Sequence, residues 1–319
     1  MGVFDLPLEE LKEYRGISPC PADFDEFWNR SVKEVKELDY QVELKKNSFQ
    51  TDFAECNDLY FTGVGGARIH AKYLKPVKAE RPHPAVFFFH GYSGDSGTWM
   101  EKLGYVANGF SVFALDCRGQ GGRSQDIGGV TGVTWSGQIM RGMEDGPEHL
   151  LFRQVFLDVV ALAEIAMGMP DIDENRIGVF GRSQGGALTI VCGALVPNVK
   201  KIAPLYPFLA DYKRVWQMDL AKVAYEDITY YFRKFDPCHE REDEIFRNLG
   251  YIDVQNFAKR IKAEVMMGTA LMDTTCPPSS QFAVYNKIHS PKRMILYPDY
   301  IHEPIQDFSD KTFQFLQTL

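Results

Sequence analysis

Residues 176–195, with the sequence RIGVFGRSQGGALTIVCGAL, decide the fold that this chain is predicted to adopt. The apolar residues 177–180 are typical of a buried strand, and the small residues after them are typical of a helix packed closely on a sheet. Between the two lies Gly181-Arg182-Ser183-Gln184-Gly185, a Gly-x-Ser-x-Gly pattern. Its glycines let a strained turn close without side-chain collisions. We therefore expect Ser183 at a sharp strand-to-helix corner, where a serine can act as a nucleophile.

The rest of the chain repeats this order of strand, loop and helix. Six short apolar runs are predicted to be buried parallel strands, at 85–90, 111–116, 176–180, 201–206, 264–269 and 293–298. Helical patterns separate most of them, at 99–107, 150–167, 184–195, 279–288 and 305–316. This alternation predicts an α/β protein with a mainly parallel central sheet and helices on both faces. Together with the serine turn, it predicts the α/β-hydrolase fold.

An N-terminal antiparallel hairpin is predicted ahead of the parallel sheet. Apolar alternation over 59–62 and 69–74 flanks the sequence GVGG at 63–66. These glycines superficially resemble a phosphate-binding loop, but a strand follows them where such a loop needs a helix. We therefore interpret 63–66 as the turn of a hairpin.

The 319 residues are predicted to form a single domain, 1–319, with three additions to the bare alternation. A helical extension is expected over about 1–55, including a helix at 22–37 with Asp23 as its N-cap. Insertions are expected at 119–149, which is rich in glycine, and at 207–250, which is rich in aromatic and charged residues. The first insertion carries Trp135, Ile139 and Met140, an apolar ribbon with few neighbours of its own. We expect a contact between copies of the chain to cover it, and hence a homo-oligomer.

A nucleophilic serine needs a base and an acid that orients it. His302 lies after the last predicted strand, in a loop that can reach the carboxyl edge of the sheet, and is the predicted base. His239 repeats the His-Glu dipeptide but follows no predicted strand, so it is interpreted as a surface or structural histidine. Asp273 falls between serine and histidine in chain order and follows a strand, so it is the predicted acid. Asp211 and Asp236 are the next candidates.

The oxyanion hole is expected to use two backbone N–H groups, those of Gln184 and Tyr92. Tyr92 lies in HGYSG, residues 90–94, whose glycines would let the backbone approach a substrate. The alternative is that Tyr92 is a packed aromatic residue. Arg118-Gly119-Gln120 follows another strand and is expected to support the site, because Arg118 can hold nearby carbonyls or carboxylates. Cys276 is interpreted as a packed thiol.

Composition excludes several other classes of function. The net charge of -8 argues against nucleic acid or an anionic membrane as the main partner, and no apolar run is long enough to span a bilayer. The six cysteines show no CxxC pair and no zinc-site spacing, so neither a metal nor another cofactor is expected. Residues 1–14 are acidic and do not form a secretory signal, which predicts reduced thiols in the cytoplasm. A mature secreted protein without its signal is the alternative.

With these motifs placed, the chain resembles the acetyl xylan esterase and cephalosporin-C deacetylase family, carbohydrate esterase family 7. The family is marked by RGQ, GxSQG and HE in this order, here at 118–120, 181–185 and 302–303. The resemblance runs nearly end to end, through further stretches such as DFDEFW, HGYSG, LLFRQVFLD, YPFLADY, FDPCHERE, GYIDVQNFA and DTTCPPSSQF.

That resemblance implies deacetylation of acetylated xylo-oligosaccharides and of cephalosporin-type acetyl esters, without a metal or organic cofactor. It implies the same triad of Ser183, Asp273 and His302, and the same oxyanion donors, Tyr92 and Gln184. It also implies a homohexamer whose active sites face an internal chamber. Two alternatives stay open: a general short-chain carboxylesterase without sugar preference, and an inactive homologue that binds a carbohydrate or a partner.

Overall fold

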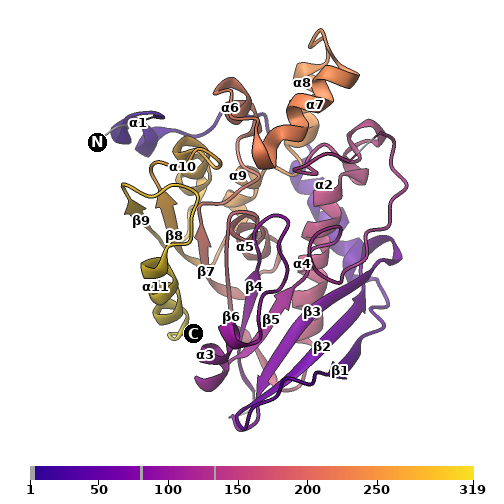
Figure 1. Cartoon of the computed structure of the whole chain (residues 1–319), viewed down its shortest axis with the longest axis vertical. Helices are drawn as coiled ribbons and strands as arrows, with labels where there is room; N and C mark the ends of the chain where they lie inside the picture. Colours follow the sequence, from indigo (N-terminus) through magenta and orange to yellow (C-terminus); the bar gives the residue numbers. More distant parts are fainter. Residues whose placement is uncertain (1–3, 80–81, 133) are drawn as a thin grey trace.

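A single mixed sheet forms the centre of the computed structural model, which describes residues 4–79, 82–132 and 134–319 (Figure 1). Its strand order is β1-β2-β3-β5-β4-β6-β7-β8-β9. The strands β1 to β3 and the pairing of β3 with β5 are antiparallel, whereas all pairs from β5 to β9 are parallel. The strands are β1 (Glu43–Lys46), β2 (Ala54–Thr62), β3 (Arg68–Pro76), β4 (His83–Phe89), β5 (Ser111–Leu115), β6 (Ile172–Arg182), β7 (Val199–Leu205), β8 (Glu264–Ala270) and β9 (Lys292–Tyr297).

Helices cover both faces of this sheet. The described helices are α1 (Leu8–Glu13), α2 (Phe24–Lys36), α3 (Leu103–Ala107), α4 (Leu151–Met167), α5 (Gln184–Leu195), α6 (Tyr212–Gln217), α7 (Glu226–Phe235), α8 (Glu242–Leu249), α9 (Val254–Phe257), α10 (Pro278–Lys287) and α11 (Gln306–Leu316). Helices α4 and α5 pack on one face, with α2 outside α4, and α3 and α11 pack on the other. The predicted α/β class is therefore confirmed, including its antiparallel N-terminal strands.

The two faces of the sheet build two separate apolar cores. In β4, Phe87 and Phe89 point into the core beneath α4 and α5, whereas Val86 points into the core beneath α3 and α11. Strands buried on both faces need apolar residues at successive positions, which explains why continuous runs rather than alternation marked them in the sequence.

The hairpin prediction is confirmed, and its edge strand is a finding that the sequence did not indicate. Residues 63–66 form the turn between β2 and β3, with Gly65 at φ 71°. Strand β1 lies outside β2 at the edge of the sheet, and all four of its residues are exposed. Its sequence, ELKK, lacks the apolar alternation that predicts a half-buried strand.

The apolar ribbon of the 119–149 insertion is largely covered by the chain itself, so the expectation that it is exposed was wrong for Ile139 and Met140, whereas Trp135 is half-buried. Ile139 is fully buried, Met140 is 5% exposed, and Trp135 stacks on Tyr230 with ring centroids 5.8 Å apart. The cover comes from the 207–250 insertion, which folds into α6, α7 and α8 beyond the upper end of the sheet in Figure 1. Long insertions that follow different strands can meet at one sheet edge, which their separate compositions did not indicate.

The N-terminal extension is anchored on the body by carboxylates. Asp23 precedes α2 as predicted, but its side chain makes no N-cap hydrogen bond and instead accepts one from the Tyr251 hydroxyl. Fully buried Asp211 accepts hydrogen bonds from the Tyr14 hydroxyl and from the backbone N–H of Ile17 and Ser18. Residues 1–3 and Val133 of the first insertion lie outside the described residues. The division into one domain with an extension and two insertions stays a prediction.

No helix within the described residues is long and apolar enough to cross a membrane.

Candidate active site

Ser183 occupies the sharp corner between β6 and α5. Its backbone lies at φ 54° and ψ −119°, a positive-φ conformation that is strained for a residue with a side chain. The corner is held by hydrogen bonds from Ser183 N–H to the Leu205 carbonyl and from Phe208 N–H to the Ser183 carbonyl. A Cβ at Gly185 would lie only 1.9 Å from the Phe89 carbonyl oxygen. The glycine is therefore required for α5 to approach β4 this closely.

His302 and Asp273 lie in line with this serine. The His302 Nε2 atom is 2.9 Å from the Ser183 hydroxyl oxygen, and its Nδ1 atom is 2.7 Å from Asp273 Oδ2. Asp273 is fully buried, and its other oxygen accepts hydrogen bonds from the backbone N–H of Thr275 and Cys276. A carboxylate acceptor on Nδ1 favours the tautomer with its proton there, which leaves Nε2 free to accept the serine proton. The structure thus brings together the three residues that the sequence singled out.

The loop that carries His302 has an anchor that sequence reasoning missed. The Tyr206 ring lies 4.7 Å from the His302 ring, and its hydroxyl donates to the Glu303 carbonyl at 2.7 Å. Burial raises the pKa of Tyr206, so its hydroxyl keeps its proton and stays a donor. Tyr206 directly follows β7, and a tyrosine at a strand's carboxyl end is a signal that could have indicated this position.

The two predicted oxyanion donors flank the serine. Gln184 is the first residue of α5, and the first N–H groups of a helix have no partner within the helix. Tyr92 lies in the loop after β4, and this loop runs beside the serine, because a Cβ at Gly91 would lie 3.9 Å from the Ser183 Cβ. The Tyr92 side chain points away to the 119–149 insertion, where its hydroxyl oxygen accepts the N–H of Gly137 at 2.7 Å.

Gln120 links the two segments that carry these donors, the start of α5 and the loop after β4. Its side-chain Nε2 donates to Gln184 Oε1 at 2.7 Å, and its Oε1 accepts from Gln184 Nε2 and from the backbone N–H of Ser93. Gln120 is therefore bound both to the residue after the serine and to the residue after Tyr92. The carbonyl of Gly119 accepts a hydrogen bond from the Gln138 side chain, which ties this turn to the first insertion.

Arg118 acts below the site rather than in it. It is fully buried, and its guanidinium binds both carboxylate oxygens of Asp158 on α4, at 2.7 and 2.6 Å. It also donates to the Val64 carbonyl in the hairpin turn and to Gln154. This bidentate pair holds the RGQ turn against α4, as expected of a residue that can bind carboxylates and carbonyls at once.

Comparison with known proteins decides the family. A family model described as acetyl xylan esterase matches residues 1–319. The chain belongs to the acetyl xylan esterase family. Acetyl xylan esterase 1 from Thermoanaerobacterium sp. JW/SL YS485 is 59% identical in sequence, with a TM-score of 0.96 over 98% of this chain and 99% of that one. The acetyl xylan esterase from Paenibacillus sp. R4 is 32% identical, with a TM-score of 0.93 over the same shares of the two chains.

A more distant relative and a fold neighbour complete the comparison. The acetyl esterase Axe7A of Xylanibacter ruminicola is 27% identical over 299 residues, which are 91% of this chain and 64% of that protein. An acylaminoacyl peptidase from Pyrococcus horikoshii shares only 16% identity, with a TM-score of 0.59 over 84% of this chain and 41% of that one, and shows the α/β-hydrolase fold alone. This esterase family member is therefore a carboxylic ester hydrolase with the predicted fold.

A buried histidine between two carboxylates lies behind the oxyanion loop and was not predicted. The His70 nitrogens are 2.6 Å from Asp116 Oδ2 and 2.9 Å from Asp58 Oδ1. Asp116 also accepts the backbone N–H groups of Ser96 and Arg123, and so links the loop after β4 to the loop after β5. Burial alone would raise the pKa of Asp116, but the hydrogen bonds from His70 and these N–H groups hold it well below its usual value.

The side chains of the residues that the sequence set aside have partners other than the serine. His239 packs between Trp216 and Phe232, with ring centroids 5.5 and 4.7 Å away, in the 207–250 insertion. His90 is held in the loop after β4, where its Nδ1 is 2.7 Å from the Gly91 carbonyl and its Nε2 accepts the N–H of Cys117. Asp236 accepts the backbone N–H of Glu240 and Arg241, which makes it an anchor of the insertion.

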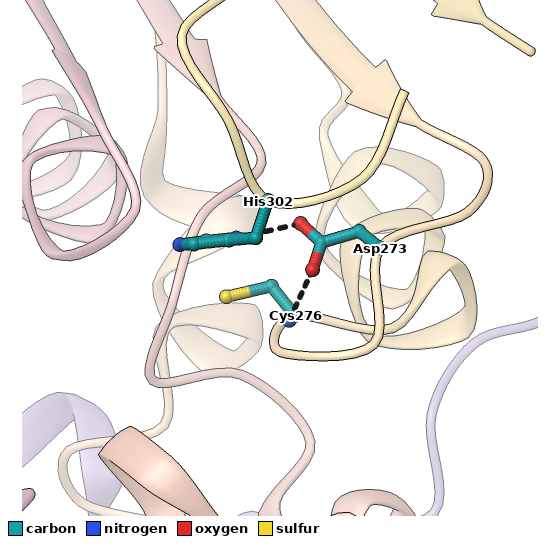
Figure 2. A group of neighbouring side chains, drawn as sticks. All are labelled: Asp273, Cys276 and His302. Atoms are coloured by element: carbon teal, nitrogen blue, oxygen red, sulfur yellow. Dashed lines mark hydrogen bonds and ion pairs between the residues drawn. The ribbon is translucent and has the colours of Figure 1, made fainter. Parts of the chain in front are cut away.

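Asp273, Cys276 and His302 also lie close enough together to be considered as metal ligands (Figure 2). Figure 2 shows the Asp273 carboxylate between the His302 ring and the backbone nitrogen of Cys276. Burial, together with the neighbouring Asp273 charge, raises the pKa of the Cys276 thiol well above its usual value. Both His302 nitrogens and both Asp273 oxygens already have hydrogen-bond partners within the protein. The donor set therefore fits a hydrogen-bonded triad better than a metal site.

Proposed function

We propose that this protein is a serine esterase that removes acetyl groups from acetylated xylo-oligosaccharides and from cephalosporin-type acetyl esters through an acetyl-serine intermediate. The observation that carries the proposal is the line of hydrogen bonds from Ser183 through His302 to Asp273. A serine, an imidazole whose Nε2 can accept the serine proton, and a buried carboxylate form the set that acyl transfer requires.

In the first half-reaction, the Ser183 hydroxyl oxygen attacks the acetyl carbonyl carbon while His302 Nε2 takes the hydroxyl proton. The negative charge that develops on the carbonyl oxygen is stabilised by the backbone N–H groups of Gln184 and Tyr92. The bond between the acetyl carbon and the sugar oxygen then breaks, and His302 returns the proton to that oxygen as it leaves. The acetyl group stays on Ser183, and the deacetylated sugar is free.

In the second half-reaction, a water molecule takes the place of the sugar oxygen. His302 Nε2 accepts its proton as the water oxygen attacks the acetyl-serine carbonyl. The same N–H groups stabilise the second tetrahedral intermediate, which collapses to acetate and a protonated Ser183. Throughout the cycle, Asp273 stabilises the imidazolium form of His302 without taking its proton.

The substrate class rests on the family to which the chain belongs and on its solved neighbours, whose names record acetyl xylan esterases. A preference for small acyl groups follows from the same likeness. Catalytic efficiency should therefore be higher for acetyl esters than for butyryl and longer esters. Equal or better turnover of octanoyl esters would favour a general carboxylesterase instead.

The central test compares the two histidines and the serine. Ser183→Ala and His302→Ala should lose nearly all turnover of p-nitrophenyl acetate with the fold intact, whereas His239→Ala should lose little. A fluorophosphonate probe should label the parent at Ser183 and leave Ser183→Ala unlabelled. Labelling at another serine, or turnover by Ser183→Ala equal to that of the parent, would rule out Ser183 as the nucleophile. If the parent protein itself did not hydrolyse the ester, the alternative of an inactive binding homologue would be supported.

We also propose a cytoplasmic location and a homohexamer. The location is supported by the six cysteines, all of which are free thiols in the structure. The hexamer rests on the family resemblance, because the apolar ribbon that suggested an interface is largely covered within the chain.

A further inference from the structure

Three segments that are distant in sequence meet at the side chain of Tyr92. The Tyr92 hydroxyl oxygen accepts the N–H of Gly137, in the 119–149 insertion, at 2.7 Å. The Tyr92 ring lies 6.4 Å from the ring of Phe208, which follows β7. The backbone of the same residue supplies one of the proposed oxyanion donors. A change in the insertions can therefore reach the reacting centre through one side chain.

Gly137 is fixed against the 207–250 insertion on its other side. Its φ is 106°, and an added Cβ would lie 2.4 Å from the Ala224 carbonyl oxygen and 2.6 Å from Asp227 Oδ1. Both the backbone conformation and the space therefore require glycine here. The segment that donates to Tyr92 thus rests directly on the first turn of α7.

Asp227 is a buried carboxyl group whose position the catalytic mechanism does not explain. It is 1% exposed, and its Oδ2 accepts the N–H of Met140 at 2.8 Å. Among the residues that the structure describes, Oδ1 has no hydrogen-bond partner and lies against Gly137. Burial raises the pKa of Asp227 to about 8, so the group is mainly neutral at pH 7. A polar group buried with one free oxygen is costly, which suggests a role in holding residues 137–140.

We propose that Asp227 and Gly137 form a latch through which α7 positions Tyr92, so that Asp227 is a positioning residue for the oxyanion hole. The latch comprises two contacts: Asp227 binds the backbone at Met140, and Gly137 binds the Tyr92 hydroxyl. This inference rests on the proposed function, in which the Tyr92 N–H stabilises the oxyanion.

The latch complements the anchor on the other side of the same loop. Gln120 holds the loop through the backbone N–H of Ser93, the residue after Tyr92. The latch holds it through the Tyr92 side chain. An oxyanion donor must lie within about 2.7–3.1 Å of the developing charge. Because a shift of about 1 Å can cost about a hundredfold in rate, a loop held on only one side should lose much of its rate enhancement.

A double-mutant cycle on Tyr92 and Asp227 tests this coupling, with p-nitrophenyl acetate as substrate. Tyr92→Phe removes only the hydroxyl group that Gly137 binds, and Asp227→Ala removes the acceptor for Met140. Each change should lower kcat at least about tenfold and leave KM nearly unchanged, because the lost interaction acts on the transition state. The double variant should be no slower than the slower single variant, because both changes release the same latch.

Two further variants separate positioning from general loss of structure. Asp227→Asn keeps an uncharged acceptor for the Met140 N–H and should retain kcat close to that of the parent at pH 7. Asp236→Ala removes another buried carboxylate of the same insertion, one that binds the backbone at Glu240 and Arg241, and should leave kcat nearly unchanged.

The proposal would be overturned by multiplicative losses in the double variant or by parental kcat in Tyr92→Phe, a change small enough to keep the fold. An equal loss in Asp236→Ala would also overturn it, because the effect would then be general destabilisation. Retained activity in Ser183→Ala would instead show that the proposed function has failed.

Discussion

At the residue scale, Asp273 orients His302 through one oxygen while the backbone holds the other. Asp273→Asn should lower kcat by about 10⁴-fold, the loss typical of this change in serine proteases. The amide oxygen can still accept the N–H groups of Thr275 and Cys276. Its NH₂ group would then face Nδ1 and favour the tautomer with the proton on Nε2, where His302 cannot accept the serine proton. Steady-state kinetics on p-nitrophenyl acetate would measure the loss.

Asp236→Asn is the matched comparison for this acid. Asp236 is also buried and also accepts two backbone N–H groups, but these belong to the 207–250 insertion. Its kcat should stay near that of the parent. A large loss in Asp236→Asn together with a small one in Asp273→Asn would show that the acid was assigned to the wrong residue.

The sequence identified the three triad candidates from their places after strands. It did not indicate the side-chain contacts between elements that are distant in sequence. Ser183, Asp273 and His302 could be predicted because chain order and strand ends place such residues at one edge of a parallel sheet. Tyr206 also follows a strand, but its contact with the His302 loop could not be identified in this way, and neither could the pairing of His70 with Asp116. Their roles depend on side-chain contacts between elements that are not neighbours in sequence.

At the element scale, the packing of α5 on the sheet depends on the absence of a side chain at one position. Gly185→Ala would place a Cβ 1.9 Å from the Phe89 carbonyl oxygen, on backbone that cannot rotate away. We expect the free energy of unfolding to fall by about 1–3 kcal/mol or more, as overpacking typically costs. Turnover should fall further, because α5 carries Ser183 and Gln184 at its N-terminus. Urea unfolding and kinetics on the same preparation would measure both effects.

Gly104→Ala provides the control for this change. Gly104 lies in α3, where a Cβ would meet only the Phe313 ring at 3.8 Å, an ordinary contact. Alanine in a helix interior is favoured over glycine by roughly 0.5–1 kcal/mol, so this variant should be as stable as the parent or slightly more so. Equal destabilisation of the two variants would contradict the close approach of α5.

The first turn of α7 should make stability depend on pH. Because the pKa of Asp227 is raised to about 8, the folded chain keeps a proton that the unfolded chain loses near its usual value of about 3.9. The contribution of Asp227 to the free energy of unfolding is fully present below about pH 4 and is lost as the pH rises towards 8. Across that range, parental stability should therefore fall relative to Asp227→Asn, by on the order of a few kcal/mol. Urea unfolding of the parent and of Asp227→Asn at several pH values would measure this difference. If the stability of the two proteins changed with pH in parallel, the raised pKa of Asp227 would be refuted.

At the scale of the whole molecule, the sequence predicted the parallel strands of the sheet better than the edge strand β1 and the contact between the two insertions. Continuous apolar runs identified all the parallel strands, because a sheet covered on both faces imposes that pattern. The exposed edge strand β1 carries no such pattern. The contact between the two insertions could not be predicted either, since residues near 135–140 and 224–235 form one apolar layer only after the sheet has brought them together.

The oligomer is the remaining prediction at this scale. Since the chain itself buries Ile139 and Met140, the expected hexamer now rests on the family resemblance, and a direct measurement of mass decides it. Light scattering coupled to size exclusion should report roughly six times the chain mass of 36.3 kDa, as a closed assembly of six copies requires. If the sites face an internal chamber, short acetylated xylo-oligosaccharides should be deacetylated faster than intact acetylxylan at equal acetyl content. A monomer that turns over both substrates equally well would exclude the chamber and leave the proposed triad unaffected, because the triad lies within one chain.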